Sequence, residues 1–290
     1  MLINVERFWI TCQELNLKLG AVIVGLCMTL ASARVGCAER LEPYRCGSVL
    51  EDAKCFLRSV LPYGALGRQP RQLPAPLEGI IGQPVVISAK AFRTFLVTHR
   101  VDESSLGGMI SEPLSKTRRG DFADYFVIHD TSTPAYANHQ EFPAFIDEAG
   151  WNQKLLRSLV RRETAHVFVD RTGQSKTSVD FASPLRTTLF EKLADGSRRG
   201  LFLGVELIQP RKLDARGIDA IAPLPGFTEA QLDRLALTYV AASIRRGRWM
   251  IPAFHAAIDF GLYNAHDDPQ NFDLKLWSQR LQLLLATILK

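Results

Sequence analysis

Residues 201–208 read LFLGVELI, a run in which Glu206 is the only charged residue. Apolar runs of this length are typical of strands that are buried within a sheet. Because side chains alternate along a strand, Gly204 and Glu206 project to the same face. A carboxylate in a buried strand costs free energy unless it is paired or serves a site. Two interpretations of Glu206 therefore stay open: an ion pair with an arginine on a neighbouring element, and a catalytic general base.

Further strand and helix patterns surround this run. Residues 125–128 (YFVI) and 167–169 (VFV) are rich in β-forming side chains and predict two more strands. Thr228 and Gln231 match a capping box, and the apolar residues that follow at helical spacing predict a long helix. A last amphipathic helix is predicted over 273–289. Strands mixed with helices predict an α/β fold in which helices pack on a sheet.

The composition is that of an ordinary globular protein. Of the 290 residues, 47% are hydrophobic and 22% are charged, which excludes a mostly disordered chain, a collagen-like repeat and a polytopic membrane protein. The formal net charge of +5 would suit a polyanionic surface such as nucleic acid or cell wall. No motif of interleaved aromatic and basic residues supports nucleic-acid binding, so we expect no nucleic-acid partner.

The N-terminus resembles a secretory signal. Residues 21–33 read AVIVGLCMTLASA, an apolar run that ends in an A-x-A cleavage pattern. This predicts a signal peptide over residues 1–33, with cleavage after Ala33 or after Ala38, and export to the periplasm or cell envelope. No stable membrane span is expected after cleavage, because the run is too short to cross a bilayer comfortably. An uncleaved anchor and a buried helix are the alternatives, and lipid attachment at Cys37 is a minority interpretation.

All cysteines fall in the first fifth of the chain. Cleavage after Ala38 would leave only Cys46 and Cys55. A single pair in an exported protein indicates a local disulfide. Two free buried thiols are the alternative.

The chain divides into two regions after the signal. Residues 39–120 are interpreted as an N-terminal extension that includes a Pro/Gly-rich connector over 62–84. The catalytic domain is expected over residues 121–290, where the strand and long-helix patterns lie.

Three residues near element ends could hold a metal ion. His129 ends the first predicted strand, His255 follows a short apolar run, and Asp268 stands before a proline. Two imidazoles and one carboxylate are a usual catalytic zinc set, because they leave a fourth position open for water. The alternative for each histidine is a structural residue that is satisfied by hydrogen bonds.

Five motifs taken together resemble a known family. They occur in the family's order and cover roughly residues 121–280: VIHDT at 127–131, AHVFVDRTGQ at 165–174, GVELI at 204–208, FTEAQLDRLA at 227–236, and HAAID with HDDPQNFD within 255–273. In this respect the chain is similar to the zinc-dependent N-acetylmuramoyl-L-alanine amidases of type 2, whose fold is shared by the peptidoglycan recognition proteins. The resemblance implies a mixed central β-sheet flanked by helices.

The resemblance also implies the roles of five residues. His129 matches the family's histidine at a strand end, His255 matches the second histidine, and Asp268 matches the acidic residue before proline, which makes these three the zinc ligands. Glu206 matches the strand glutamate that activates water. His266 takes the place of the residue that stabilises the oxyanion, so Glu206 and His266 are the expected catalytic residues.

The implied activity is hydrolysis of the amide between N-acetylmuramic acid and L-alanine, with Zn²⁺ as cofactor and peptidoglycan or muropeptides as substrate. The alternative is a module of the same fold that binds peptidoglycan without turnover.

Overall fold

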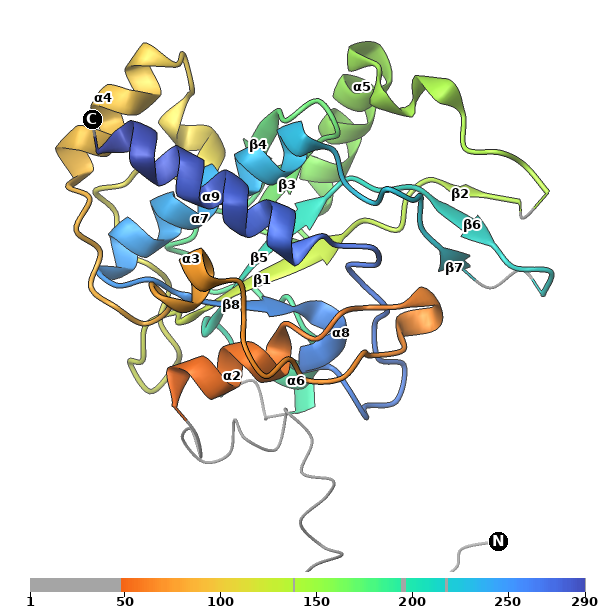
Figure 1. The fold of residues 1–290 in the computed structure, drawn as a ribbon, viewed down its shortest axis with the longest axis horizontal. Coiled ribbons are helices and arrows are strands. Elements are labelled where there is room, and N and C mark those ends of the chain that lie inside the picture. The colour runs from red at the N-terminus through yellow and green to blue at the C-terminus, as the bar shows by residue number, and fades with distance from the viewer. Residues whose placement is uncertain (1–47, 138, 194–196, 217–218, 290) are drawn as a thin grey trace, which may run out of the picture. The chain divides into compact units, whose positions relative to one another are not determined.

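The computed structural model describes residues 48–289 except 138, 194–196 and 217–218, and all of these belong to one unit, Cys37–Lys290 (Figure 1). Its centre is a five-stranded sheet in the order β4-β3-β5-β1-β8. Four strands run parallel, and β4 is antiparallel to β3. The strands are β1 (Tyr125–Asp130), β3 (Val167–Val169), β4 (Ser175–Thr177), β5 (Phe202–Leu207) and β8 (Ile251–Phe254). The predicted α/β fold, with a mixed central sheet, is therefore confirmed.

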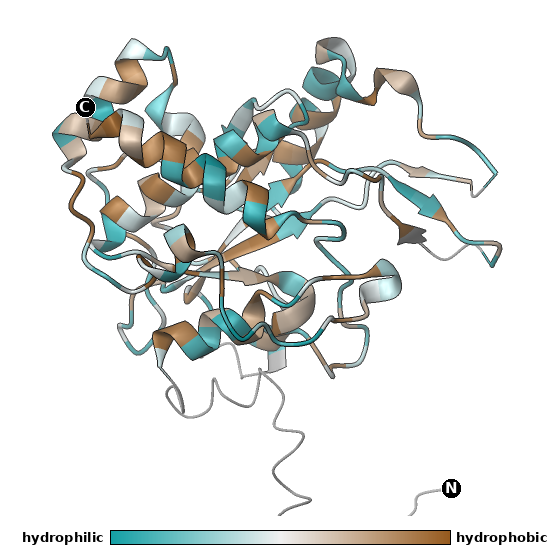
Figure 2. Cartoon of the chain, viewed as in Figure 1, coloured by the Kyte–Doolittle hydropathy of each residue, from teal (hydrophilic) through white to brown (hydrophobic). Residues whose placement is uncertain are grey.

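Helices cover both faces of this sheet. Consecutive side chains of β1 show this, because Tyr125 contacts Phe56 of α2 (Val49–Phe56) and Phe126 contacts Tyr239 of α7 (Glu229–Arg246). On the α7 side lies α9 (Leu274–Ile288), whose Trp277 also contacts Tyr239. On the α2 side lie α6 (Leu189–Leu193) and α8 (His255–Ile258). Strands enclosed in this way are expected to be apolar on both sides, and Figure 2 shows hydrophobic residues along the central strands. All six residues of β1 are buried.

The two long helices form where the sequence predicts them. Thr228 and Gln231 make the reciprocal bonds of a capping box at the start of α7, and Gly247 ends the helix in a left-handed conformation. The start of α9 is capped by Asp273, whose side chain accepts a hydrogen bond from the Leu276 N–H. Local capping and periodicity thus account for both helices.

Residues 48–120 pack into the same hydrophobic core as the sheet. Buried residues of this segment, such as Phe56, Leu77 and Phe92, belong to one cluster with those of β1 and α7. Its remaining elements are η4 (Pro62–Gly64), α3 (Ala75–Glu78), α4 (Ala89–Thr98) and η5 (Glu103–Leu106). Between α2 and α4 the chain is mostly without regular structure, in keeping with its proline and glycine content.

The remaining elements lie after β1. A smaller sheet in the order β2-β6-β7 is formed by β2 (Ala135–Tyr136), β6 (Arg211–Leu213) and β7 (Asp219–Ile221). The segment between β2 and β3 contains η6 (Ala144–Asp147), α5 (Ala149–Leu159) and η7 (Val160–Arg162).

The expectations for the N-terminus fall outside the described residues. These are the signal peptide over 1–33, the cleavage after Ala33 or Ala38, and Cys46. Cys55 is in a disulfide, and the other cysteines of the chain all precede residue 48. Within the described part of the chain, no helix has the length and apolar character that a bilayer crossing requires.

Candidate metal centre

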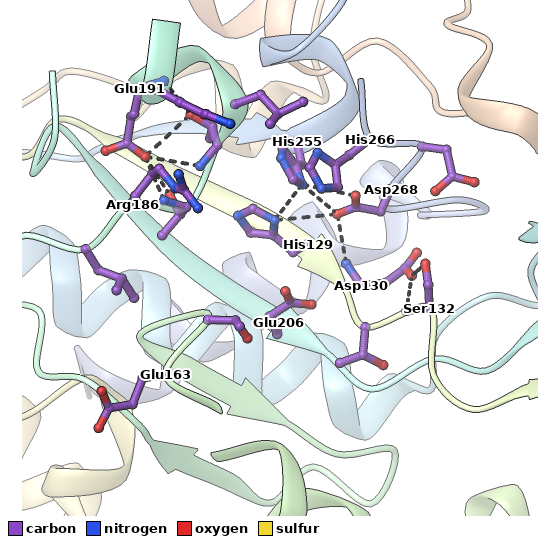
Figure 3. A pocket seen from close by; sticks show the side chains of 18 of the residues that line it. His129, Asp130, Ser132, Glu163, Arg186, Glu191, Glu206, His255, His266 and Asp268 are labelled. Atoms are coloured by element: carbon purple, nitrogen blue, oxygen red, sulfur yellow. Dashed lines mark hydrogen bonds and ion pairs between the residues drawn. The ribbon is translucent and has the colours of Figure 1, made fainter. Parts of the chain in front are cut away.

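The candidate site lies at the carboxyl ends of three neighbouring parallel strands, β5, β1 and β8 (Figure 3). His129 pairs with Glu206 across β1 and β5, so both side chains project to the same face. Ile128 pairs with Phe254 across β1 and β8, and His255 therefore follows beside His129. Sites at the carboxyl ends of parallel strands are the rule in sheets of this kind.

The structure brings His129, His255 and Asp268 together. One potential ligand atom of each lies within 4.8 Å of the other two, and all three residues are buried. The two histidine Nδ1 atoms are 2.8 Å apart. Asp268 Oδ1 is 3.0 Å from Nδ1 of His255, and Asp268 Oδ2 is 3.6 Å from Nδ1 of His129. These three groups could hold a metal ion.

The spacing of the donor atoms suits a small divalent ion. Two ligands bound to one tetrahedral zinc ion at ~2.0–2.1 Å stand about 3.3 Å apart. With Oδ2 of Asp268 as the third donor atom, the three separations are 2.8, 3.3 and 3.6 Å, which lie around that value. Imidazole nitrogen with a carboxylate oxygen is a donor set that zinc accepts readily.

Burial and charge set the protonation of the two histidines in the metal-free protein. Burial and the neighbouring His255 lower the pKa of His129 to about 3. Burial also acts to lower the pKa of His255, but Asp268 and Asp259 outweigh it and raise that pKa to about 10. Of the two rings, His255 is therefore the one that carries the extra proton, and its Nδ1 lies within hydrogen-bond distance of both His129 and Asp268.

A buried charge network holds the third ligand in place. The backbone N–H of Asp130 donates to Oδ2 of Asp268 at 3.1 Å. The carboxylate of Asp130 accepts from Arg211 of β6 at 2.7 Å, and the same guanidinium donates to Asp267 at 3.2 Å. Because Arg211 is fully buried, the smaller sheet is tied directly to the loop that carries Asp268.

Glu206 stands beside this cluster with a free oxygen. Its Oε2 is buried and makes no hydrogen bond within the described residues, so the ion pair with an arginine is not formed there. Burial raises the pKa of Glu206 well above its ordinary value, and Asp268 and Asp130 act in the same direction. A bound cation next to this carboxyl would favour its charged form, as a general base requires.

His266 lies at the edge of the cluster and contacts a residue that the sequence analysis did not identify. Its Nδ1 donates to Oδ2 of Asp259 at 3.0 Å, and its ring stacks on that of His255 with 4.0 Å between centroids. Asp259 Oδ2 is also 2.9 Å from Nε2 of His255. Burial acts to raise the pKa of Asp259, yet its contacts with the two histidines hold that pKa well below its usual range.

A signal for Asp259 exists in the sequence. It stands four residues after His255, a spacing that brings two side chains together on one helical turn. No comparable local signal marks Arg211, because its partners lie on a different strand and in a distant loop.

The cluster opens into a cavity of about 930 Å³. Glu206, His266 and the three candidate ligands all line it, so the predicted site residues face one space. Three basic side chains also line the cavity, those of Arg186, Lys192 and Arg199. The volume lies at the large end of the range for small-molecule sites, which is about 300–1,000 Å³.

Comparisons with known proteins identify one distant structural neighbour and no family. No family model matches the chain, and a search of curated proteins found no match. Among solved structures, the chain is similar to the Ph2119 endolysin from Thermus scotoductus MAT2119 bacteriophage Ph2119. The two share 11% identity with a TM-score of 0.35, and the match covers 58% of this chain and 89% of the endolysin. A likeness at this TM-score supports no particular function.

Proposed function

We propose that this protein is a zinc-dependent amidase that hydrolyses the amide between N-acetylmuramic acid and L-alanine. The observation that carries the proposal is the meeting of His129, His255 and Asp268 at the floor of a cavity that Glu206 also lines. The peptidoglycan or muropeptide substrate rests on the resemblance of residues 121–280 to the type 2 amidases. Export to the periplasm or cell envelope, expected from the N-terminus, would place the protein where that substrate lies.

The three candidate ligands would leave one coordination position of the metal ion open for water or substrate. Two imidazoles and one carboxylate leave the fourth position of a zinc ion open, and zinc bound in this way lowers the pKa of water toward ~7 and polarises a carbonyl. In the structure the ligand atoms converge next to the cavity rather than inside the sheet.

Glu206 would transfer the proton, and His266 would stabilise the negative charge that develops on the carbonyl oxygen. The free Oε2 of Glu206 accepts the proton from the attacking water and passes it to the leaving amine of L-alanine. His266 lies at the cavity edge, where its ring, when both nitrogens carry a hydrogen, can donate to the carbonyl oxygen as negative charge develops on it. Each of these roles needs the side chain to face the cavity, as both do.

The test is Glu206→Gln in the full chain. Gln keeps the shape of the side chain and removes its basicity, so kcat for muropeptide cleavage should fall by ~10²–10⁴. Zinc content should stay near that of the wild type, because Glu206 is not a ligand. Mass spectrometry of a muropeptide digest measures the first quantity, and metal analysis of the purified protein measures the second.

Two further variants serve as a control and as a test of the zinc ligands. Glu141→Gln, at an exposed position that pairs with Lys212, is the matched control and should keep full activity. His129→Ala should lose both zinc and activity. A folded Glu206→Gln protein that keeps its zinc and cleaves at the wild-type rate would refute the mechanism. Wild-type protein that binds muropeptides without ever releasing the peptide would instead support a binding module.

A further inference from the structure

Asp259 is a buried carboxylate that neither the ligand set nor the proposed proton transfers use. It follows the last residue of α8, and its side chain is completely inaccessible to solvent. The backbone N–H groups of Leu189 and Phe190 donate to it at 3.2 and 3.1 Å, which anchors it to the start of α6. Asp259 does not line the cavity, so it cannot touch a substrate there.

The two nitrogens of His255 face different partners. Nδ1 lies toward His129 and Asp268, while Nε2 is 2.9 Å from Oδ2 of Asp259. The Nε2–H direction falls to one side of that oxygen, so the contact is an ion pair rather than a linear hydrogen bond. An imidazole that gives Nδ1 to a metal keeps its hydrogen on Nε2, and a carboxylate at that nitrogen stabilises this form.

The same oxygen also orients His266. Because an ionised carboxylate can only accept hydrogen bonds, Nδ1 of His266 must carry the hydrogen that it donates to Asp259 at 3.0 Å. The other nitrogen, Nε2, is then left for the cavity that this half-exposed ring lines. The ring cannot turn freely, since it stacks on His255 at an angle of 24° between the planes.

A second metal ion does not explain this arrangement. His255, Asp259 and His266 do offer ligand atoms within 4.8 Å of one another. However, the lone pair of an imidazole nitrogen lies in the plane of its ring. Two rings stacked 4.0 Å apart and nearly parallel direct their lone pairs side by side rather than to one point. The shared carboxylate accounts for the contacts without an ion.

We propose that Asp259 is a positioning residue that orients two histidines at once, holding His255 with Nδ1 toward the metal and His266 with Nε2 toward the cavity. The part that concerns catalysis by His266 rests on the function proposed above. The part that concerns His255 requires only that the site binds a metal ion.

The experiment compares Asp259→Asn with the wild type in the full chain. Asn keeps the size of the side chain but loses the charge that favours the two N–H groups. Removing such an outer partner of a metal-bound histidine typically weakens metal affinity by ~10–100-fold, and we expect the zinc dissociation constant to rise by that factor. A competing chelator measures it. Asp233→Asn, an exposed ion-pair carboxylate of α7, is the matched control and should change the affinity by less than about twofold.

Nitrogen NMR of histidine-labelled wild-type protein tests the orientation without any variant. We expect the neutral ring of His266 as the Nδ1–H tautomer, so that its Nε2 can take up the second hydrogen that donation to the carbonyl oxygen requires. In the zinc-loaded protein we expect His255 protonated at Nε2, and metal analysis should give one zinc ion per chain. In Asp259→Asn the His266 signals should move toward a mixture of tautomers. These readouts remain available if the variant folds poorly, because the wild type alone shows the tautomer.

Several outcomes would overturn the proposal. His266 as the Nε2–H tautomer in the wild type, two zinc ions per chain, or an Asp259→Asn protein with wild-type zinc affinity would each do so. None of these depends on amidase activity. A protein that shows the expected tautomer and affinity change but cleaves no muropeptide would therefore retain the role of Asp259 and lose the proposed function.

Discussion

His166 is a fully buried histidine whose hydrogen bonds support the strand that carries Glu206. Its Nδ1 accepts from the backbone N–H of Gly204 at 3.1 Å, and its Nε2 lies 3.2 Å from the carbonyl oxygen of Ser183. Nδ1 can accept only if it carries no hydrogen, so the ring is neutral and Nε2 donates. Burial lowers the pKa of His166 to about 4, because the charged form would lose its hydration.

This histidine should make the free energy of unfolding depend on pH. Between pH ~6.5 and ~4 the unfolded chain binds a proton at this position and the folded chain does not, so stability falls as pH is lowered through that window. The full loss is on the order of 3 kcal/mol. Urea unfolding at a series of pH values measures it, and His166→Gln should flatten this part of the curve.

The exposed His139 supplies the comparison. His139→Gln should leave the pH dependence as in the wild type. If His166→Gln and His139→Gln give the same slope between pH 4 and 6.5, then the protonation of His166 does not contribute to stability in the way described here.

At the scale of elements, the close packing of β5 against the segment that leads into α6 requires a glycine at position 204. A Cβ added at Gly204 would lie 2.7 Å from Cγ2 of Thr187 and 3.2 Å from Nε2 of His129. Gly204 therefore lets the segment before α6 approach the sheet directly above the site. The backbone there is ordinary, and close packing is what requires glycine.

We expect Gly204→Ala to destabilise the protein by ~1–3 kcal/mol, the usual cost of adding a methyl group to a packed interior. Because the methyl would press on His129, zinc affinity should fall as well. Thermal unfolding and chelator competition measure the two effects.

Gly150→Ala is the matched control, since that exposed glycine of α5 has nothing within 4 Å of an added Cβ. Its stability should stay equal or rise by up to ~1 kcal/mol, as alanine favours a helix. Equal stability and zinc affinity in both variants would show that the space at Gly204 is not needed.

For the whole molecule, export and the disulfide form a joint prediction. Protein recovered from the exporting cell should begin after Ala33 or after Ala38, as N-terminal sequencing would show. After cleavage at Ala38 the chain would hold only Cys46 and Cys55, so the disulfide of Cys55 would have to join these two within one chain. Mass spectrometry of an unreduced digest should detect that linked peptide. An intact Met1, or Cys55 linked to a different cysteine, would contradict the prediction.

Several features could be predicted from the sequence because neighbouring residues determine them. The strand at 202–207 follows from an apolar run, and the helix at 229–246 follows from a capping box and helical periodicity. The places of His129, His255 and Asp268 at element ends, together with the family's motif order, indicate these residues as candidate ligands. Each of these signals spans only a short stretch of chain.

Only the tertiary structure decided what these residues meet. His129 and His255 stand 126 positions apart and come together because β1 pairs with β8 in one register. Arg211 reaches Asp130 across 81 positions, and Asp259 accepts from α6 across 70. Contacts of this kind depend on strand order and register, which no local pattern encodes, since a shift of one residue would turn every side chain to the other face. Residues 48–120 pack into the core of the sheet for a similar reason. Burial of apolar surface drives this packing but has no direction, so the local sequence does not determine which apolar surfaces come into contact.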